Sequence, residues 1–212
     1  MERDFVGYAD TPPVVPWPNG ARLAVQISVS YEEGAEYSLL DGPRRETMGE
    51  VPSPVPPDRR DLFNESFFEY GSRVGVWRIL ETCRRAGVPA SWWACARALE
   101  RNPRVARALV AAGHEICGHN DARFWRGGLT SVGAFTEYMR SAFDCLYAEA
   151  QRVPRMMSIG LHCRIAGTPA RSRAFVEFLE YARRFPGVWF ARRVDIARWW
   201  LEHQPPALRS SP

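Results

Sequence analysis

The sequence contains no lysine: all 28 of its basic residues are arginine, and with 24 acidic residues the formal net charge is +4. The arginines are scattered and form no run longer than a pair, so the charge does not predict a nucleic-acid-binding surface. No apolar run reaches the ~18 residues that suggest a membrane span. Met1 is followed by Glu2, Arg3 and Asp4 rather than by a basic and then apolar leader, which predicts a soluble, cytoplasmic protein without a membrane partner.

Closely spaced cysteine pairs are also lacking. The sequence has five cysteines, an odd number, and no two of them form a CxxC pair. This pattern argues against a disulfide framework and against a structural zinc site. It is typical of a reducing compartment, where thiols mostly act as small buried hydrophobic groups. The cysteines are Cys83, Cys95, Cys117, Cys145 and Cys163.

One stretch, RLAVQISVSYEEGAE at residues 22–36, is the most informative part of the chain. Apolar residues alternate with small or polar ones along its first ten positions, which predicts a β-strand. Glu32 and Glu33 follow directly, and Gly34 then allows the backbone to turn sharply. The strand is therefore predicted to end in two adjacent carboxylates.

Further strands and helices alternate along the chain. The pattern of apolar residues, together with helix-starting and helix-ending residues, defines their extents. Strands are predicted over 90–95, 114–119, 156–162 and 188–192, and helices over 72–86, from 102–103 to 113, and over 132–151, 172–185 and 194–202.

This alternation predicts an α/β fold, a mainly parallel sheet or barrel with right-handed crossovers. At 212 residues the chain is expected to form a single domain, 1–212. Prolines predict an extended lead-in over residues 1–20, which Trp17 anchors to the body of the domain. They also predict an irregular loop over 41–61, either a functional lid, an oligomer contact or a plain insertion.

Charged and imidazole side chains follow the ends of several predicted strands. The carboxyl ends of parallel strands meet on one face, so these groups are expected to converge. A carboxylate that deprotonates water and an imidazole that protonates a leaving nitrogen would form a hydrolytic site. The alternative for each histidine is an ordinary loop residue with local partners. The groups are Glu32, Glu33, His119, His162, Arg192 and Arg193.

Several blocks of the sequence resemble the polysaccharide deacetylase (NodB-like) superfamily, and within it the cofactor-independent allantoinase branch. The blocks occur in the family's order and cover most of residues 4–203. The resemblance implies an incomplete or distorted (β/α) barrel of the polysaccharide deacetylase type. The matching blocks are GYADTPP, WPNGARLAVQISVSYEEGAE, FEYGSRVGVWR, GHEICGH, GLHCRIAGTPAR and VWFARRVDIARWW.

The resemblance implies a hydrolase that opens the cyclic amide of allantoin to give allantoate, in purine catabolism. Glu32 or Glu33 would then act as the base toward water. His119 and His162 would position water, stabilise the oxyanion or protonate the leaving nitrogen. A small polar substrate is expected as the partner of this site, and the family resemblance also implies a homo-oligomer. Candidates for orienting the substrate, which could equally pair with neighbours, are Glu69, Arg73 and Arg164.

The resemblance also implies that no metal is bound. The superfamily's first motif has two aspartates, one a base and the other a metal ligand, and Glu32 and Glu33 occupy the matching positions. The superfamily's second histidine is replaced by Arg123, four residues after His119. The alternative is a facial set of Glu33, His119 and His162 around a divalent ion.

A middle segment of the family pattern is absent, as if two family segments were joined between His119 and Asn120. Strands beside the gap would have unpaired edges. Two further hypotheses therefore stand beside the allantoinase. One is a metal-dependent deacetylase of N-acetyl sugars in carbohydrate metabolism. The other is a truncated, catalytically inactive family member that survives as an assembly or binding partner.

Overall fold

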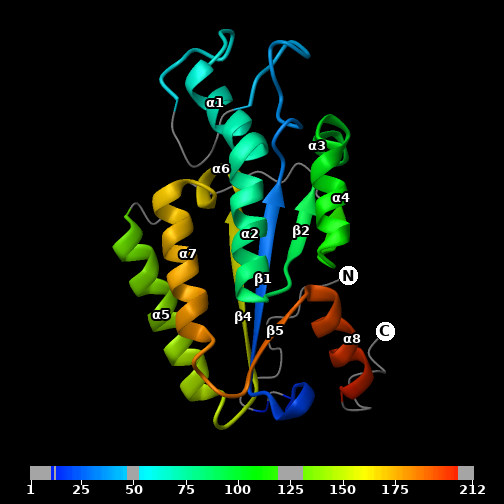
Figure 1. Ribbon diagram of the computed structural model, residues 1–212, viewed down its shortest axis with the longest axis vertical. Coiled ribbons are helices and arrows are strands. Elements are labelled where there is room, and N and C mark those ends of the chain that lie inside the picture. Colours follow the sequence, from blue (N-terminus) through cyan, green and yellow to red (C-terminus); the bar gives the residue numbers. More distant parts are fainter. Residues whose placement is uncertain (1–10, 12, 47–52, 119–130, 205–212) are drawn as a thin grey trace.

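The computed structural model describes residues 11, 13–46, 53–118 and 131–204, which form a parallel sheet with helices packed against it (Figure 1). None of the described helices is long and apolar enough to cross a membrane. The elements are η1 (Pro18–Gly20), β1 (Leu23–Tyr31), α1 (Leu62–Tyr70), η2 (Gly71–Gly75), α2 (Val76–Ala86), β2 (Ser91–Ala94), α3 (Ala96–Arg101), α4 (Pro103–Ala111), β3 (Glu115–Gly118), α5 (Val132–Glu149), β4 (Arg155–His162), α6 (Cys163–Ala166), α7 (Pro169–Ala182), β5 (Val188–Ala191) and α8 (Arg193–His203).

The sheet is built around β1, and every strand pairing in the described residues is parallel. The strand order is β3-β2-β1-β4, and β5 pairs separately with β1. Because β4 pairs with residues 23–30 of β1, it occupies one whole edge of that strand. On the other edge, β5 pairs with residues 23–26 and β2 with residues 28–31. The predicted α/β class with mainly parallel strands is thus confirmed.

The two faces of β1 differ in chemistry. Its alternating apolar residues, from Leu23 to Tyr31, are fully buried and belong to one core cluster with side chains of α2, α4, α5 and α7. Figure 1 shows α2 lying across β1, with α7 and α5 beside it. The opposite face, which we call the polar face, carries Gln26, Ser28 and Ser30 of β1 and the residues in register with them on the neighbouring strands. The apolar face of β1 is therefore the one packed against α2, α4, α5 and α7, as the strict alternation requires.

The sheet does not close into a barrel within the described residues. There, β3 and β4 each pair with a single strand and lie at opposite ends of the strand order. On β4, Met156 is 50% exposed, and Ser158 and Gly160 are also exposed on the polar face. The structure thus agrees with the expectation of an incomplete or distorted barrel.

Helix α8 and the lead-in cover the part of the polar face at the amino-terminal end of β1. Trp17, predicted as an anchor, is 6% exposed and donates from Nε1 to the carbonyl oxygen of Arg155 at 2.8 Å. Trp17 and Ile196 of α8 belong to a second apolar cluster that includes Ala24 of β1. This cluster covers the amino-terminal part of β1 on the polar face.

The helix predicted over 72–86 begins earlier than expected. Helical backbone starts at Leu62 and continues through η2, a single π-helical segment, into α2. Asp61 caps its amino terminus by accepting from the Asn64 amide. The prediction was wrong here because the exposed aromatic Phe63 gave no amphipathic pattern. Two short helices, α3 and α6, were also not predicted.

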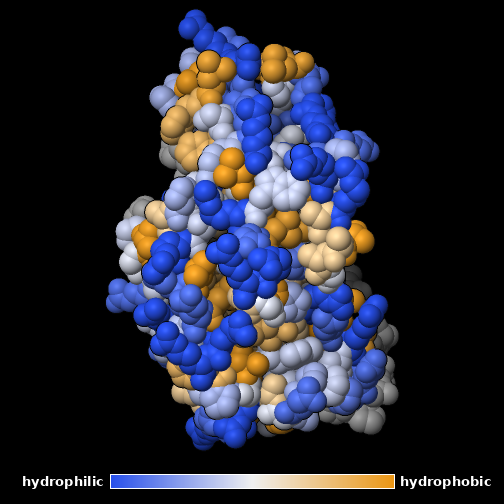
Figure 2. Space-filling view, in the orientation of Figure 1, coloured by the Kyte–Doolittle hydropathy of each residue, from blue (hydrophilic) through white to orange (hydrophobic). Residues whose placement is uncertain are grey.

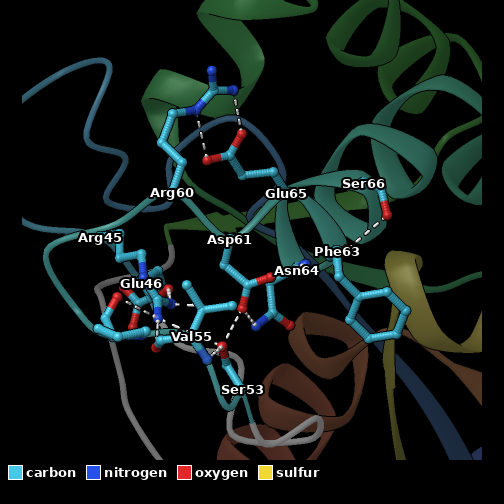
Figure 3. Close-up of polar contacts among 11 residues, drawn as sticks. Arg45, Glu46, Ser53, Val55, Arg60, Asp61, Phe63, Asn64, Glu65 and Ser66 are labelled. Carbon is cyan, nitrogen blue, oxygen red and sulfur yellow. Dashed lines mark hydrogen bonds and ion pairs between the residues drawn. The ribbon is translucent and has the colours of Figure 1, made fainter.

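The described part of the proline-rich loop is tied to the same cap. The Asp61 carboxylate accepts from the Ser53 hydroxyl and, at 2.6 Å, from Asn64 Nδ2 (Figure 3). Arg45 lies 3.8 Å from Asp61 Oδ2, and both side chains are 4% exposed. The Arg45 guanidinium also donates to the Val55 carbonyl oxygen at 2.5 Å. One buried carboxylate thus connects both sides of the loop to α1.

Replacing Asp61 with alanine is expected to lower the midpoint of thermal unfolding, because the helix loses its cap and Arg45 loses its counter-charge. Asp61→Asn keeps an oxygen that can accept from the helix amide, so its midpoint should fall less. Circular dichroism melts of both variants test this, with the exposed Asp58→Ala as the matched control. Equal midpoints for Asp61→Ala and Asp58→Ala would show that the contacts of Asp61 with Arg45, Ser53 and Asn64 do not stabilise the fold.

Candidate functional site

The two glutamates that end β1 occupy different environments. Glu33 is 1% exposed and is thus fully buried, whereas the side chain of Glu32 is 21% exposed. Gly34 has φ +99°, a backbone conformation that favours glycine, so the chain turns directly after the pair. The predicted carboxylate pair is therefore present, but only Glu32 is accessible from solvent.

Arg164 connects the two acids. It lies in α6, immediately after β4, and is 4% exposed. Its guanidinium Nη1 donates to Glu32 Oε2 at 2.8 Å and lies 3.6 Å from Glu33 Oε1. Its backbone amide donates to Glu33 Oε1 at 2.9 Å, and its guanidinium carbon lies 4.7 Å from the ring centre of Phe68. Arg164, predicted to orient substrate, thus acts in this structure as the cation between two carboxylates.

The helix beside Glu33 comes unusually close. A Cβ atom added to Gly71 would lie 2.7 Å from both Cγ and Oε1 of Glu33 and 2.9 Å from the Arg164 amide nitrogen. Any larger residue at this position would displace the buried carboxylate. A further backbone amide, that of Glu32, donates to Glu33 Oε2 at 3.0 Å. Glu33 is therefore held by the backbone on several sides.

His162, the last residue of β4, lies beside the accessible acid. Its Nδ1 is 3.5 Å from Glu32 Oε2. His162 is in register with Ser30 of β1, so it belongs to the polar face near the carboxyl end of the sheet. Glu32 and His162, both predicted site residues, are thus brought together. The other predicted histidine, His119, lies outside the described residues.

Glu69 and Arg73 were predicted either to orient substrate or to pair with neighbours. They form an i,i+4 ion pair at 3.0 Å, with side chains 59% and 74% exposed respectively. This is the alternative that the sequence left open, in which neighbours on a helix pair with each other. The structure places no contact between them and the described Glu32–His162 pair.

The two acids have opposite pKa shifts. Burial alone would raise the pKa of Glu32, but the hydrogen bond with His162 and the charge of Arg164 outweigh it, so the pKa lies well below its usual range. For Glu33 complete burial dominates and raises the pKa, although the charge of Arg164 and hydrogen bonds from its own backbone and that of Arg164 oppose this. Glu32 is therefore the more acidic of the two carboxyl groups.

These shifts predict how stability depends on pH. Because the pKa of Glu33 is higher in the folded than in the unfolded chain, its contribution to stability is complete below its usual pKa of 4.5 and is lost as pH rises through the raised value. Glu33→Gln should therefore remove a decline of at most about 1.4 kcal/mol per pH unit above pH 4.5. Urea unfolding between pH 4.5 and 8 measures this, with exposed Glu180→Gln as control. An identical pH profile in the Glu33 variant would contradict the assignment.

The described residues do not fit a divalent metal at this position. The cation between the two carboxylates is the Arg164 guanidinium, and Glu33 is closed off by Gly71. In the described part of the chain no group of three histidine, cysteine or acidic side chains is placed to hold a metal ion.

A groove between α2 and α7 lies on the helix-covered side, away from Glu32. Figure 2 shows this side to be mainly hydrophilic, with separate hydrophobic patches. Several of its lining side chains already have partners: Glu81 pairs with Arg84 and Arg85, and Arg173 pairs with Glu177. The lining residues include Arg73, Trp77, Arg78, Glu81, Arg85, Arg173, Glu180, Arg183 and Arg184.

Two solved structures resemble this chain over nearly its whole length. One is the crystal structure of a Pseudomonas aeruginosa PAO1 protein named as a probable polysaccharide deacetylase, with 31% identity and a TM-score of 0.85 over 95% of this chain and 98% of that one. The chain belongs to the polysaccharide deacetylase family. A model of the family described as polysaccharide deacetylase also matches residues 65–149. The second structure is that of PuuE allantoinase, with 32% identity and a TM-score of 0.84, again over 95% of this chain and 98% of that one.

One family member is longer than this chain. A Schizosaccharomyces pombe protein named as a polysaccharide deacetylase is 29% identical, and the alignment covers 96% of this chain and 98% of the relative. That alignment extends over 314 positions, whereas this chain has 212 residues. The relative therefore contains residues that have no counterpart here. This agrees with the prediction of a missing middle segment; its position after His119 stays a prediction.

Sequence reasoning missed two features of the site. Arg164 was predicted either to orient substrate or to pair with neighbours, and nothing local indicates that α6 turns its guanidinium toward both glutamates. Trp93, on the polar face, was assigned only to a strand. The alternation of side chains along a strand could have identified it. Trp92 is fully buried in the core, so its neighbour Trp93 must lie on the other face.

Proposed function

We propose that this chain is an allantoinase-like hydrolase that opens a cyclic amide, with His162 as the proton carrier. The observation that carries this proposal is the pair formed by Glu32 Oε2 and His162 Nδ1, 3.5 Å apart, at the carboxyl end of the sheet. The likeness to PuuE allantoinase over 95% of this chain supports the choice of substrate.

Glu32 is a weak base, since its pKa is held well below the usual range by His162 and Arg164 despite burial. A carboxylate of this kind is better suited to orient an imidazole. It holds the Nδ1 proton of His162 and leaves proton exchange to Nε2, as an acid does for a catalytic histidine in hydrolases. Glu32 is therefore a positioning residue in this proposal, and His162 is catalytic.

The two reactants in this proposal are water and the cyclic amide. Water adds to a ring carbonyl carbon as one of its protons passes to His162 Nε2. The C–N bond breaks, and the same proton passes to the leaving nitrogen, which gives an open-chain carboxylic acid. Glu33 takes no part, because it is fully buried and is held by backbone amides.

The test is release of allantoate from allantoin by the purified chain, with and without chelator, together with size-exclusion chromatography for the expected homo-oligomer. Turnover that persists with chelator and disappears in His162→Ala supports the proposal. A folded, soluble wild-type chain that releases no allantoate would refute it.

The second candidate is a metal-dependent deacetylase of N-acetyl sugars, favoured by the names of the Pseudomonas aeruginosa and Schizosaccharomyces pombe relatives. It predicts acetate release from chitin oligomers that requires an added divalent ion. The third, an inactive member, is supported by the sheet that stays open in the described residues. It predicts that a folded chain releases neither allantoate from allantoin nor acetate from chitin oligomers.

A further inference from the structure

The polar face carries a row of side chains level with His162. In the parallel register, His162 of β4 is the neighbour of Ser30 of β1, and Ser30 is the neighbour of Trp93 of β2. Adjacent strands lie about 4.8 Å apart, so the backbones at His162 and Trp93 are separated by about 10 Å. The row therefore has an imidazole at one end, an indole at the other and a small hydroxyl residue between them.

Trp93 is held in place on this face. Its Nε1 donates to Ser28 Oγ at 3.1 Å. Ser28 in turn accepts from Gln26 Nε2 at 3.2 Å, and Ser158 donates to Gln26 Oε1 at 2.6 Å. Gln26 is 2% exposed. This hydrogen-bonded chain across three strands fixes the indole over the sheet and limits its motion.

Arg193 lies against the indole. Its guanidinium carbon is 4.7 Å from the centre of the Trp93 ring. On one edge of β1, β5 pairs with residues 23–26 and β2 with residues 28–31. Helix α8 follows β5 directly, so its first residues lie beside β2. The Arg193 amide donates to Ser91 Oγ at 2.8 Å, and the next amide, of Val194, donates to Glu115 Oε2 at 3.2 Å.

Arg193 differs from its neighbour in charge pairing. Arg192 donates to Asp195 at 2.7 Å and so completes the amino-terminal cap of α8. No acid of the described ranges forms an ion pair with the Arg193 guanidinium, which is exposed on a fixed aromatic ring. A stacked guanidinium keeps its planar set of donors available for carbonyl or carboxylate oxygens.

We propose that Trp93 and Arg193 form the substrate-recognition site of the polar face, binding the carbonyl oxygens of a planar cyclic amide opposite His162. The inference rests on the proposed function. Arg193 donates hydrogen bonds to the ring carbonyl oxygens that are not attacked, and Trp93 fixes the plane of the guanidinium. The ring then lies over Ser30, with its reacting carbonyl directed toward His162.

The test combines kinetics with a binding measurement that needs no turnover. Arg193→Met should raise KM for allantoin about 10- to 100-fold, the loss expected for a charge-assisted hydrogen bond, with a smaller change in kcat. Arg193→Lys should raise KM less than Arg193→Met does, because lysine keeps the positive charge but lacks the planar set of donors. Trp93→Phe keeps an aromatic ring but loses the hydrogen bond to Ser28. Its KM for allantoin should therefore lie between those of wild type and Arg193→Met. Exposed Arg198→Met on the same helix is the matched control.

The same variants in a His162→Ala background separate this inference from the proposed function, because allantoin binding can be followed there by calorimetry without hydrolysis. Binding that weakens at least tenfold with Arg193→Met supports the site even if wild type shows no turnover. Equal affinity or equal KM with and without Arg193 overturns it, even if wild type is an active allantoinase. Absence of any allantoin binding overturns it as well.

Discussion

Replacing Arg164 with methionine is expected to lower the free energy of unfolding by about 3–5 kcal/mol, the usual cost of removing one partner of a buried ion pair. The side chain of Arg164 is 5% exposed and that of Glu33 is fully buried, so water cannot replace the lost cation. Methionine preserves most of the side-chain length, so the loss measures charge rather than a cavity. Urea unfolding followed by circular dichroism gives the value.

A double variant makes this prediction specific. Glu33→Gln removes the buried charge that Arg164 neutralises, so Arg164→Met should cost less in that background. Arg173→Met, which breaks only the exposed pair with Glu177, should leave the unfolding midpoint nearly unchanged. Additive losses for Arg164→Met and Glu33→Gln would mean that the guanidinium does not stabilise the buried acid.

The second large effect is expected on catalysis. If His162 carries the proton, His162→Ala should lower kcat for allantoin by about 10²- to 10⁴-fold, the usual contribution of a general acid–base group. Glu32→Gln should lower kcat as well, because the imidazole loses the carboxylate 3.5 Å from its Nδ1. Glu32→Asp, which keeps a carboxylate, should recover part of the lost rate.

Partial recovery of kcat in Glu32→Asp but not in Glu32→Gln separates positioning by the carboxylate from simple structural damage. If both substitutions only loosened the fold, kcat would fall in step with the unfolding midpoint in each variant. His203→Gln is the control for histidine chemistry, because His203 is exposed at the end of α8 and accounts for no step of the reaction. Equal kcat in Glu32→Gln and wild type would mean that this carboxylate does not position His162.

Much of the fold could be predicted because its signals are local. The period of two in β1 and the helical spacing in α2, α5 and α7 arise from adjacent residues, and these elements lie close to their expected ranges. Asn102 followed by Pro103 marks a helix start, and α4 begins at Pro103. By contrast, the start of α1 depends on Asp61, whose partners Ser53 and Arg45 come from the distant side of a loop.

The candidate site was predicted only in part. The position of Glu32 and His162 at strand ends follows from alternation and parallel topology, and both lie together on the polar face. The burial of Glu33 depends on how closely Gly71 approaches, a contact between residues far apart in the chain. Glu69 and Arg73 form the i,i+4 pair that the sequence left open as the alternative, because this pairing depends only on local spacing.

The sequence by itself determined the class of fold, the strand ends at which polar groups gather and the family resemblance, because each depends on spacing along the chain. Only the tertiary structure decided which glutamate is accessible, that Arg164 neutralises both, and that Arg193 lies on Trp93. These depend on strand register and on helices from distant segments, and a shift of one residue in register would exchange the two faces of the sheet.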